Sequence, residues 1–399
     1  MEETERNHII HKIGEGVVSP LGFTADAVYA AILRGERGGA LHEGTFGVPE
    51  PFFASILDKT HLRNSFSALT DFGCEGYTSV EMAAIVAANQ AIEEANIAPD
   101  RSDVQFILST TKGNVDLLEN NPYEPERPYL WHTAQMVADF YDNPNRPIVV
   151  SNACISGCAA QVEAFRQLRQ GTCKYAIVVG VDMLSKFVVS GFQSFKALSP
   201  ELCKPFDANR RGLNLGEAAA AIVYTMGDED EILTGELIPE GWAIRNDANH
   251  ISGPSRTGEG LLRAIQAATQ SHDTSRIAFI NAHGTATPYN DDMESMAISR
   301  AGLAHTPVNS LKGYLGHTLG AAGILEVILS AHALRDHTAI PSAGTETPGT
   351  VAEINICFNT SDTIHQQDAN THSVHGDHFL KLISGFGGSN AALLFRIKQ

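Results

Sequence analysis

The chain has 399 residues, enough for two or three average domains or for one large duplicated α/β unit with an ample core. Hydrophobic residues make up 43% and charged residues 19%, and a net charge of −18 without any stretch dense in lysine or arginine argues against a nucleic-acid or anionic-membrane partner. The acidic N-terminus has no apolar run of signal-peptide length, and no segment approaches the ~20 apolar residues of a membrane span, so we expect a cytoplasmic protein.

Buried strands and amphipathic helices alternate along the first half of the chain. Short apolar runs predict strands at 104–110, 147–153, 175–184 and 217–225. Apolar residues spaced at i, i+3 and i+4 predict helices at 80–97 and 159–171. This alternation indicates an α/β protein in which helices cover a buried sheet.

The second half repeats this organisation. A strand that runs into a polar loop is predicted at 276–287, a short strand, glycine-rich turn and long helix at 306–336, and a strand, turn and strand at 383–395. We therefore interpret the chain as a duplication of one α/β unit, with halves at 1–230 and 231–399. The connecting loops are predicted at 38–60, 111–130, 196–216, 226–260 and 359–378.

The cysteines and histidines do not form an obvious metal motif. The six cysteines lack metal-like C-x-x-C spacing and any disulfide framework, which predicts reduced thiols. A metal site could form where histidines gather near the C-terminus, but the segment has no helix or strand period to fix ligand geometry, so we favour a solvated polar turn. These histidines are His365, His372, His375 and His378.

The stretch "SNACISGCAA" places Cys154 between a predicted strand and a predicted helix. Exposed N–H groups and the macrodipole at a helix start favour a thiolate, so we expect a lowered pKa and a candidate nucleophile. Small neighbouring residues would let a substrate approach. A buried structural cysteine explains this segment equally well, and Cys158, one turn further on, is a weaker candidate for the nucleophile.

Two further segments carry histidines at turns. His283 ends a predicted strand, where α/β sheets expose functional groups, although a structural histidine is the alternative. Asp291 and Glu294 follow it, and we expect them to cap a helix or orient the loop rather than to act in acid/base catalysis. Lys312 and His317 flank the glycines of one tight turn, which favours an anion site there, while close helix packing would also explain the glycines.

The segment "ISGFGGSNAALLF" has glycines on both sides of Phe386. Glycines adopt backbone conformations that other residues avoid and leave N–H groups unobstructed. Such groups can form half of an oxyanion hole. A plain hairpin turn is the alternative interpretation.

Taken together, these segments resemble the β-ketoacyl synthases of the thiolase superfamily, in particular the elongating class with a Cys-His-His set. The motifs "VVSPLG", "NACISG", "KALSP", "PFDANRRGLNLGEAAAA", "HGTATPYNDDMES", "KGYLGHTLGAAG" and "GFGGSN" occur in the order found in that family. The resemblance spans almost the whole chain. It implies a thiolase-like fold of duplicated α/β/α/β/α layers.

The resemblance also implies a decarboxylative condensation. Cys154 would take an acyl group from an acyl carrier protein, and His283 and His317 would flank the malonyl thioester and stabilise the enolate formed when CO₂ leaves. The backbone N–H groups of Cys154 and Phe386 would form the oxyanion hole, with Phe386 also acting as a gate. Lys312 would support the charge balance.

Supporting roles follow from the same resemblance. Asp291 and Glu294 would hold the loop behind His283, whereas Asp207 and Glu217 are interpreted as structural. No metal, nucleotide or flavin cofactor is needed for this chemistry.

The sequence departs from the family pattern beside the nucleophile. Ile155 stands where many relatives have Ser or Thr, so we expect Ile155, with Phe192, to shape the substrate pocket. The product would be a β-ketoacyl thioester two carbons longer. Its pathway, fatty-acid or aryl-polyene and polyketide-type, is left open.

The implied partners are an acyl carrier protein in its acyl and malonyl forms and a second subunit. A homodimer is expected, and a heterodimer with a sister subunit is the other possibility. A non-catalytic partner of the chain-length-factor kind is the competing interpretation, but such subunits typically lack the nucleophile that this chain retains. Candidates for a basic rim that meets the carrier are Lys59, Arg63, Lys204, Arg210 and Arg211.

Overall fold

The computed structural model describes residues 8–71, 73–251, 253–359 and 371–399. The described elements of the first half are β1 (His8–Val18), α1 (Ala25–Leu33), β2 (Ala40–His42), η1 (Thr45–Gly47), β3 (Phe52–Ser55), α2 (Lys59–Ser67), α3 (Ser79–Ala95), β4 (Val104–Ser109), η2 (Val115–Leu118), α4 (Leu130–Phe140), β5 (Ile148–Val150), α5 (Ser156–Arg169), β6 (Tyr175–Asp182), α6 (Lys186–Ser194), β7 (Leu215–Gly216), β8 (Ala218–Asp228) and η3 (Glu229–Glu231).

The described elements of the second half are β9 (Leu237–Asn246), α7 (Glu259–Thr269), η4 (Thr274–Arg276), β10 (Ile277–Asn281), α8 (Pro288–Arg300), β11 (Val308–Asn309), α9 (Lys312–Leu315), η5 (Leu319–Ala321), α10 (Ala322–Arg335), β12 (Thr338–Ala339), β13 (His372–Ser373), β14 (His378–Gly385) and β15 (Ser389–Ile397).

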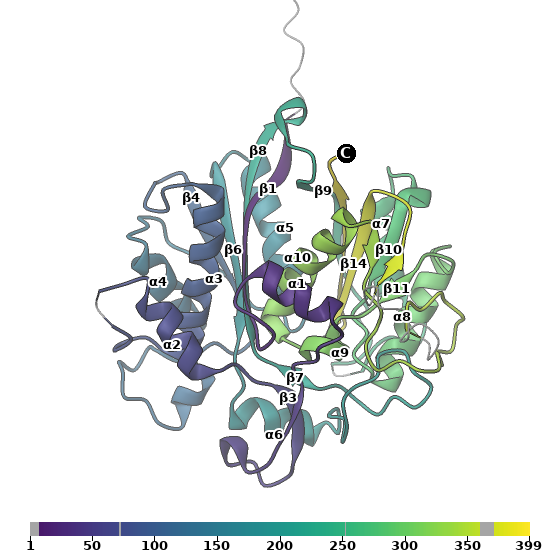
Figure 1. Ribbon diagram of the computed structural model, residues 1–399, viewed down its shortest axis with the longest axis horizontal. Coiled ribbons are helices and arrows are strands. Elements are labelled where there is room, and N and C mark those ends of the chain that lie inside the picture. Colours follow the sequence, from purple (N-terminus) through teal and green to yellow (C-terminus); the bar gives the residue numbers. More distant parts are fainter. Residues whose placement is uncertain (1–7, 72, 252, 360–370) are drawn as a thin grey trace, which may run out of the picture.

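Two mixed sheets enclose a central layer of helices (Figure 1). The strand orders are β1-β8-β6-β4-β5 in the first sheet and β11-β10-β14-β15-β9 in the second. Helices α5 and α10 pack between the sheets, α3 covers the outer face of the first sheet, and α7 and α8 cover that of the second. This arrangement confirms the expected thiolase-like α/β/α/β/α layers.

The two sheets share one pairing pattern. Beginning at β5 or at β11, two parallel pairings are followed by two antiparallel pairings. Strands β5 and β11 therefore hold equivalent places, as do β4 and β10. Because Cys154 follows β5 and His317 lies in the connection after β11, the shared pairing pattern brings the two side chains toward one another from opposite sheets.

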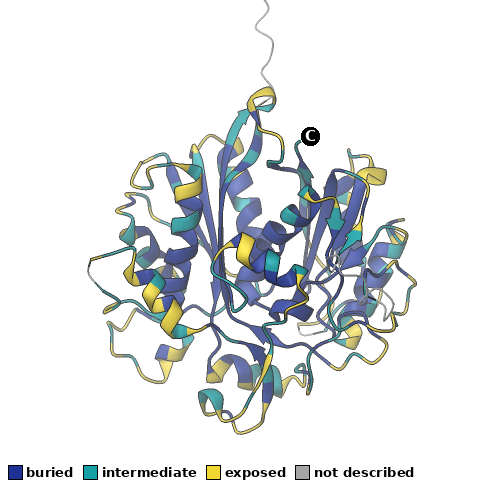
Figure 2. Ribbon diagram, in the orientation of Figure 1, coloured by how far each residue is buried: buried dark blue, intermediate teal, exposed yellow. Residues whose placement is uncertain are grey.

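The central layer is the most thoroughly buried part of the molecule (Figure 2). Helix α10 is apolar on almost every face, and nearly all of its residues are buried. A helix without a polar face needs protein on all sides, and the two sheets supply it. Strands β6 and β8 are likewise buried on both faces, as their continuous apolar runs predicted.

Several segments predicted as loops contain strands. The predicted loop 38–60 contains β2 and β3, and the predicted loop 196–216 contains β7. The predicted loop 226–260 contains β9, an edge strand of the second sheet whose Pro239 and Gly241 resemble loop residues. The predicted polar turn near the C-terminus contains β13 and the start of β14, so His372 lies in a strand and His378 is buried. His365 lies outside the described residues.

Two glycines in β1 allow α3 to pack closely against the first sheet. A Cβ added to Gly14 would lie 2.1 Å from the carbonyl oxygen of Ala91, and one added to Gly16 would lie 2.0 Å from that of Ala87. Real carbon atoms do not approach so closely. The sequence "KIGEGVV" is thus explained by the contact between the strand and the helix.

We expect Gly16→Ala to lower the free energy of unfolding by about 1–3 kcal/mol, because α3 must move away from β1 to admit the methyl group. Denaturant unfolding measures the effect. The control is Gly191→Ala in α6, where a Cβ meets no atom within 4 Å and alanine favours the helix. An equal response of the two variants would contradict this explanation.

Candidate functional site

Cys154 lies in a sharp turn between β5 and α5. Ala153 has a φ of +45°, in the left-handed region that non-glycine residues seldom adopt, and it turns the chain abruptly. The turn is closed by Ser156, whose Oγ accepts the Asn152 N–H at 2.8 Å and donates to the Ala153 carbonyl at 2.6 Å. Helix α5 begins at Ser156, so Cys154 precedes the first helical turn.

His283 lies on the loop that follows β10, and α8 holds the backbone of this loop. The carboxylate of Glu294 accepts the N–H groups of His283 and Gly284, each at 2.7 Å. Asp291 accepts the N–H of Thr285 at 3.0 Å. Both acidic residues therefore lie behind the His283 loop, where the resemblance placed them.

His317 lies between α9 and η5 with a defined orientation. Its Nδ1 accepts the backbone N–H of Leu319 at 3.3 Å, which places the hydrogen of the neutral ring on Nε2. Within the described residues, this buried Nε2 has no hydrogen-bond partner. The ring thus presents an unused N–H donor to the site.

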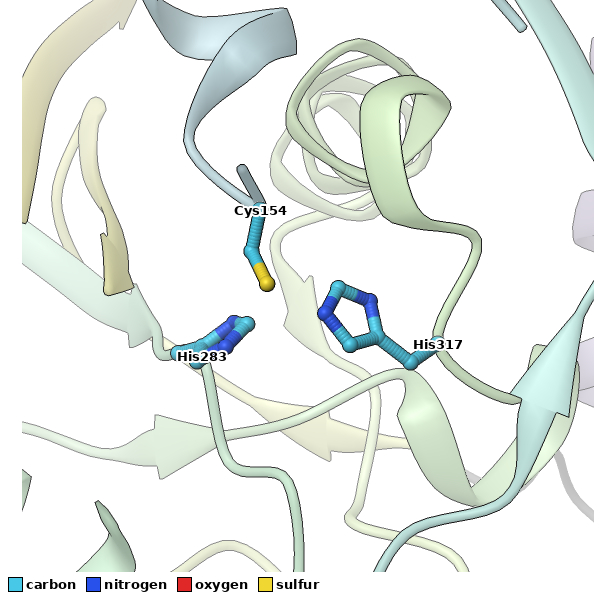
Figure 3. Close-up of side chains that lie close together, drawn as sticks. All are labelled: Cys154, His283 and His317. Carbon is cyan, nitrogen blue, oxygen red and sulfur yellow. The ribbon is translucent and has the colours of Figure 1, made fainter. Parts of the chain in front are cut away.

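Cys154, His283 and His317 meet in space from three separate segments (Figure 3). The Cys154 sulfur and a ring nitrogen from each histidine all lie within 4.8 Å of one another. The two rings meet edge to face, with centroids 5.0 Å apart. All three side chains line one cavity of about 430 Å³.

Burial determines the protonation states of Cys154, His283 and His317. It raises the pKa of the Cys154 thiol to about 11, against the opposing effects of the Lys312 ammonium and of the backbone N–H of Phe386. The expectation of a lowered thiol pKa was therefore wrong, because desolvation outweighs the nearby helix start. Burial, followed by the charge of Lys312, lowers the pKa of both His283 and His317 well below its usual value, so both rings are neutral.

A buried charge network lies beneath the histidines. Lys312 donates to Glu326 Oε1 at 2.7 Å, and Lys381 donates to the other oxygen of Glu326 and to Asn281 Oδ1. Because Lys312 is paired with Glu326, its ammonium is already engaged and does not supply the cation expected for an anion site at this turn. The sequence analysis missed Glu326 and Lys381, although a charged residue within the apolar runs "AGILEVIL" and "FLKLIS" is a recognisable signal.

Phe386 lies in the turn between β14 and β15, next to the nucleophile. Its N–H lowers the pKa of Cys154, which places this donor at the sulfur. The ring is 38% exposed and packs against Phe192 and Phe195 of neighbouring α6 and its C-terminal end, at centroid distances of 6.0 and 5.4 Å. Phe192 and Phe386 line the cavity, whereas Ile155 is fully buried in the core and does not contribute to this cavity wall.

The two acidic residues that were interpreted as structural, Glu217 and Asp207, each accept backbone N–H groups. Glu217 is buried and accepts the N–H groups of Leu57 and Leu184, while Asp207 accepts those of Glu346 and Thr347. Both contacts are structural.

The candidate basic rim is only partly available to a partner. Lys59 pairs with Glu217 and Arg210 pairs with Asp292, so their charges are already engaged. Arg63 and Arg211 are exposed, and Lys204 is half-buried. Of these five candidates, Arg211 lines the cavity.

Family models place this architecture among known proteins. "Beta-ketoacyl synthase, N-terminal domain" matches residues 49–227, and "Beta-ketoacyl synthase, C-terminal domain" matches residues 238–346. The chain belongs to the β-ketoacyl synthase family. It is therefore an acyltransferase.

Individual relatives agree over nearly the full length. This synthase is 26% identical to 3-oxoacyl-(acyl-carrier-protein) synthase 2 of Staphylococcus aureus, with 96% of this chain and 97% of the relative covered. A β-ketoacyl synthase structure from Burkholderia phymatum matches with a TM-score of 0.86 at 24% identity, covering 98% of this chain and all of the other.

A ketosynthase in complex with its chain length factor, from Xenorhabdus doucetiae, matches with a TM-score of 0.83 at 24% identity over the whole of both chains. These solved structures share the fold of the synthase described here. Within the described ranges of the synthase, the helices lack the combined length and hydrophobicity that crossing a membrane requires.

The raised thiol pKa predicts how Cys154 reacts with iodoacetamide. Because the thiolate fraction grows about tenfold per pH unit below the pKa, the alkylation rate should climb from pH 7 to pH 9 without a plateau. Peptide mass spectrometry of quenched samples measures the rate, with Cys154→Ala identifying the peptide. A rise of only about threefold between pH 8 and pH 9, as for a free thiol whose pKa is about 8.5, would contradict the dominance of burial.

Proposed function

We propose that this synthase condenses an acyl group on Cys154 with malonyl-acyl carrier protein, releasing CO₂ and a β-ketoacyl-carrier thioester. The observation that carries the proposal is the convergence of the Cys154 sulfur with the ring nitrogens of His283 and His317. A thiol beside two neutral imidazoles suits acyl transfer followed by stabilisation of an enolate.

In the first half-reaction, the Cys154 sulfur attacks the carbonyl carbon of the acyl thioester. The new C–S bond forms as the bond to the carrier sulfur breaks, and the thiol proton ends on the departing carrier. The tetrahedral oxyanion would accept the N–H groups of Cys154 and Phe386, both of which favour negative charge at the nucleophile. Because the thiol is protonated at rest, its proton must leave during attack, and His283 is a neighbouring neutral base.

In the second half-reaction, malonyl thioester replaces the departed carrier. The bond to its carboxylate breaks, CO₂ leaves, and the electron pair forms an enolate whose oxygen faces the His317 Nε2–H. The enolate carbon attacks the acyl carbonyl, and the Cys154 thiolate departs. A proton taken up by the sulfur restores the starting thiol, so no electrons are gained or lost overall.

The proposed partners are the acyl and malonyl forms of an acyl carrier protein. Carrier proteins of this kind are acidic, so Arg211 at the cavity is the best-placed of the predicted basic residues. Lys196 also lines this cavity and adds a second positive charge, which the sequence analysis did not single out. A homodimer is the proposed assembly, and fatty-acid and polyene or polyketide-type products are both compatible with the residues at the site.

One solved relative gives weight to a second function, a subunit resembling a chain length factor that pairs with an active synthase. The Xenorhabdus structure joins a ketosynthase to such a subunit, and its match covers the whole chain. The proposed catalytic function is favoured because Cys154, His283 and His317 meet in one accessible cavity.

Replacement of the nucleophile separates these two functions. We expect Cys154→Ala to abolish condensation of a loaded acyl carrier with malonyl carrier, because no thiol accepts the acyl group, and to abolish covalent labelling by cerulenin. Product formation and intact-protein mass spectrometry measure the two effects. Unimpaired activity of Cys154→Ala paired with a sister synthase would assign the chain a non-catalytic role. Unimpaired activity of the variant alone would refute Cys154 as the nucleophile.

Replacing each histidine should affect the two half-reactions to different extents. His317→Ala deletes the N–H donor aimed at the enolate and should lower malonyl-carrier decarboxylation by about a hundredfold or more, while acylation of Cys154 persists. His283→Ala should also impair decarboxylation, because both imidazoles are proposed to flank the malonyl thioester. It should in addition slow acylation, because His283 is the proposed base for the thiol proton. Radiolabelled CO₂ release and acyl-enzyme mass report the steps separately, and an unchanged condensation rate in either variant would refute the assigned role.

A further inference from the structure

A second group of metal-ligand side chains lies far from the reaction centre. Glu240, His272 and His378 each offer one donor atom, and these atoms lie within 4.8 Å of one another. His378 begins β14, whereas Phe386 follows its end. Because the strand has eight residues, the two ends are about 23 Å apart, and this group is separate from the proposed catalytic site.

We propose that Glu240, His272 and His378 form a binding site for a divalent transition metal of the zinc class. Two imidazole nitrogens and one carboxylate oxygen are a ligand set that zinc accepts, with a fourth position left for water. The ion would join β9, β14 and the connection between α7 and η4. Its role would be to stabilise this end of the second sheet.

The backbone aims Glu240 toward the histidines. Along the pairing of β15 with β9, Leu394 faces Gly241 but Phe395 faces Pro239, so Glu240 is the extra residue of a β-bulge. Bulges redirect a side chain from the regular strand alternation. Oε2 of Glu240 lies 2.7 Å from Nε2 of His378 and 3.3 Å from Nδ1 of His272.

These distances are close to those that a metal requires. Ligand atoms bonded to zinc at about 2.1 Å in tetrahedral directions lie about 3.4 Å from one another. Side-chain adjustments of less than a bond length would therefore convert the present contacts into a coordination sphere. His272 has an exposed fraction of 25% and lines a surface hollow with Glu240, which gives an ion a route of entry.

Neighbouring groups orient two of the ligands from behind. Asp377 Oδ1 lies 2.6 Å from His378 Nδ1 and would hold the hydrogen there, leaving Nε2 directed at Glu240 as a lone-pair donor. Arg396 donates to Oε1 of Glu240 at 2.5 Å and leaves Oε2 for the ion. Carboxylate-to-histidine and donor-to-carboxylate contacts of this kind support metal ligands in proteins.

The surrounding charge favours a cation. Arg396 and Arg276 contribute positive charge near the ligands, but each is paired with a carboxylate, Arg396 with Glu229 and Glu240 and Arg276 with Asp377. Asp273 adds a further negative charge that acts on His378. Arg169 lines the same hollow as Glu240 and His272, so three guanidinium groups lie near the ligands. The carboxylates still outnumber them, with Glu229, Glu240, Asp273 and Asp377.

The test must exclude metal bound at the catalytic cavity, because Cys154, His283 and His317 also place metal-ligand atoms near one another. The full-length Cys154→Ala protein is treated with EDTA, exchanged into metal-free buffer, and titrated with zinc chloride by calorimetry. We expect one zinc per chain. In the same background, His272→Ala should weaken binding about tenfold or more.

A matched control replaces a histidine outside the cluster. His305 is exposed and lies between α8 and β11, so His305→Ala in the Cys154→Ala background should bind zinc unchanged. Circular dichroism establishes folding, and His272→Gln provides a second variant should His272→Ala unfold. Zinc should raise the melting temperature of Cys154→Ala and of the His305 control but not that of the His272 variants.

The visible spectrum of bound cobalt(II) is an independent measurement of which atoms coordinate the metal. In the Cys154→Ala background its visible spectrum should show nitrogen and oxygen ligation without a thiolate charge-transfer band, and His272→Ala should lose that spectrum. The proposal is overturned by absence of zinc binding in Cys154→Ala, by equal affinity in the His272 variants, or by equal loss of affinity in His305→Ala.

Discussion

The pairing of one buried carboxylate with two ammonium groups is the interaction on which the site depends. Glu326 of α10 meets Lys312 of α9 and Lys381 of β14, and all three lie between the sheets. Two ammonium groups in this apolar layer would be strongly destabilising without that carboxylate, because isolated buried charges lose their hydration. The contact also joins the helix before His317 to the strand that leads to Phe386.

The network leaves positive potential around Cys154, His283 and His317, three groups that are themselves neutral. Burial and Lys312 keep His283 and His317 unprotonated, and burial keeps the Cys154 thiol protonated. New negative charge would then develop beside these three groups as the reaction proceeds, at an oxyanion or an enolate. Donors fixed beforehand stabilise such charge most effectively, since they do not reorganise when it forms.

The sequence predicted the layers from its local patterns, and the grouping of Cys154, His283 and His317 from its resemblance to a family, since each of these residues alone also had a structural explanation. It failed where the outcome depends on partners distant in the chain. Glu326 and Lys381 are 55 residues apart, and their pairing follows from the packing of α10 on β14. The prediction of a lowered pKa for Cys154 was wrong for the same reason, since the burial of the thiol is determined by the complete fold.

The two histidines differ in a way that makes their proposed tasks unequal. The backbone N–H of Leu319 fixes the His317 tautomer, so that ring is suited to remain a donor at Nε2 throughout. Nδ1 of His283 is buried and lacks a hydrogen-bond partner within the described residues, while Glu294 holds its backbone rather than its ring. Since no contact to Nδ1 commits this ring to one tautomer, His283 is the better suited of the two to receive a proton and return it.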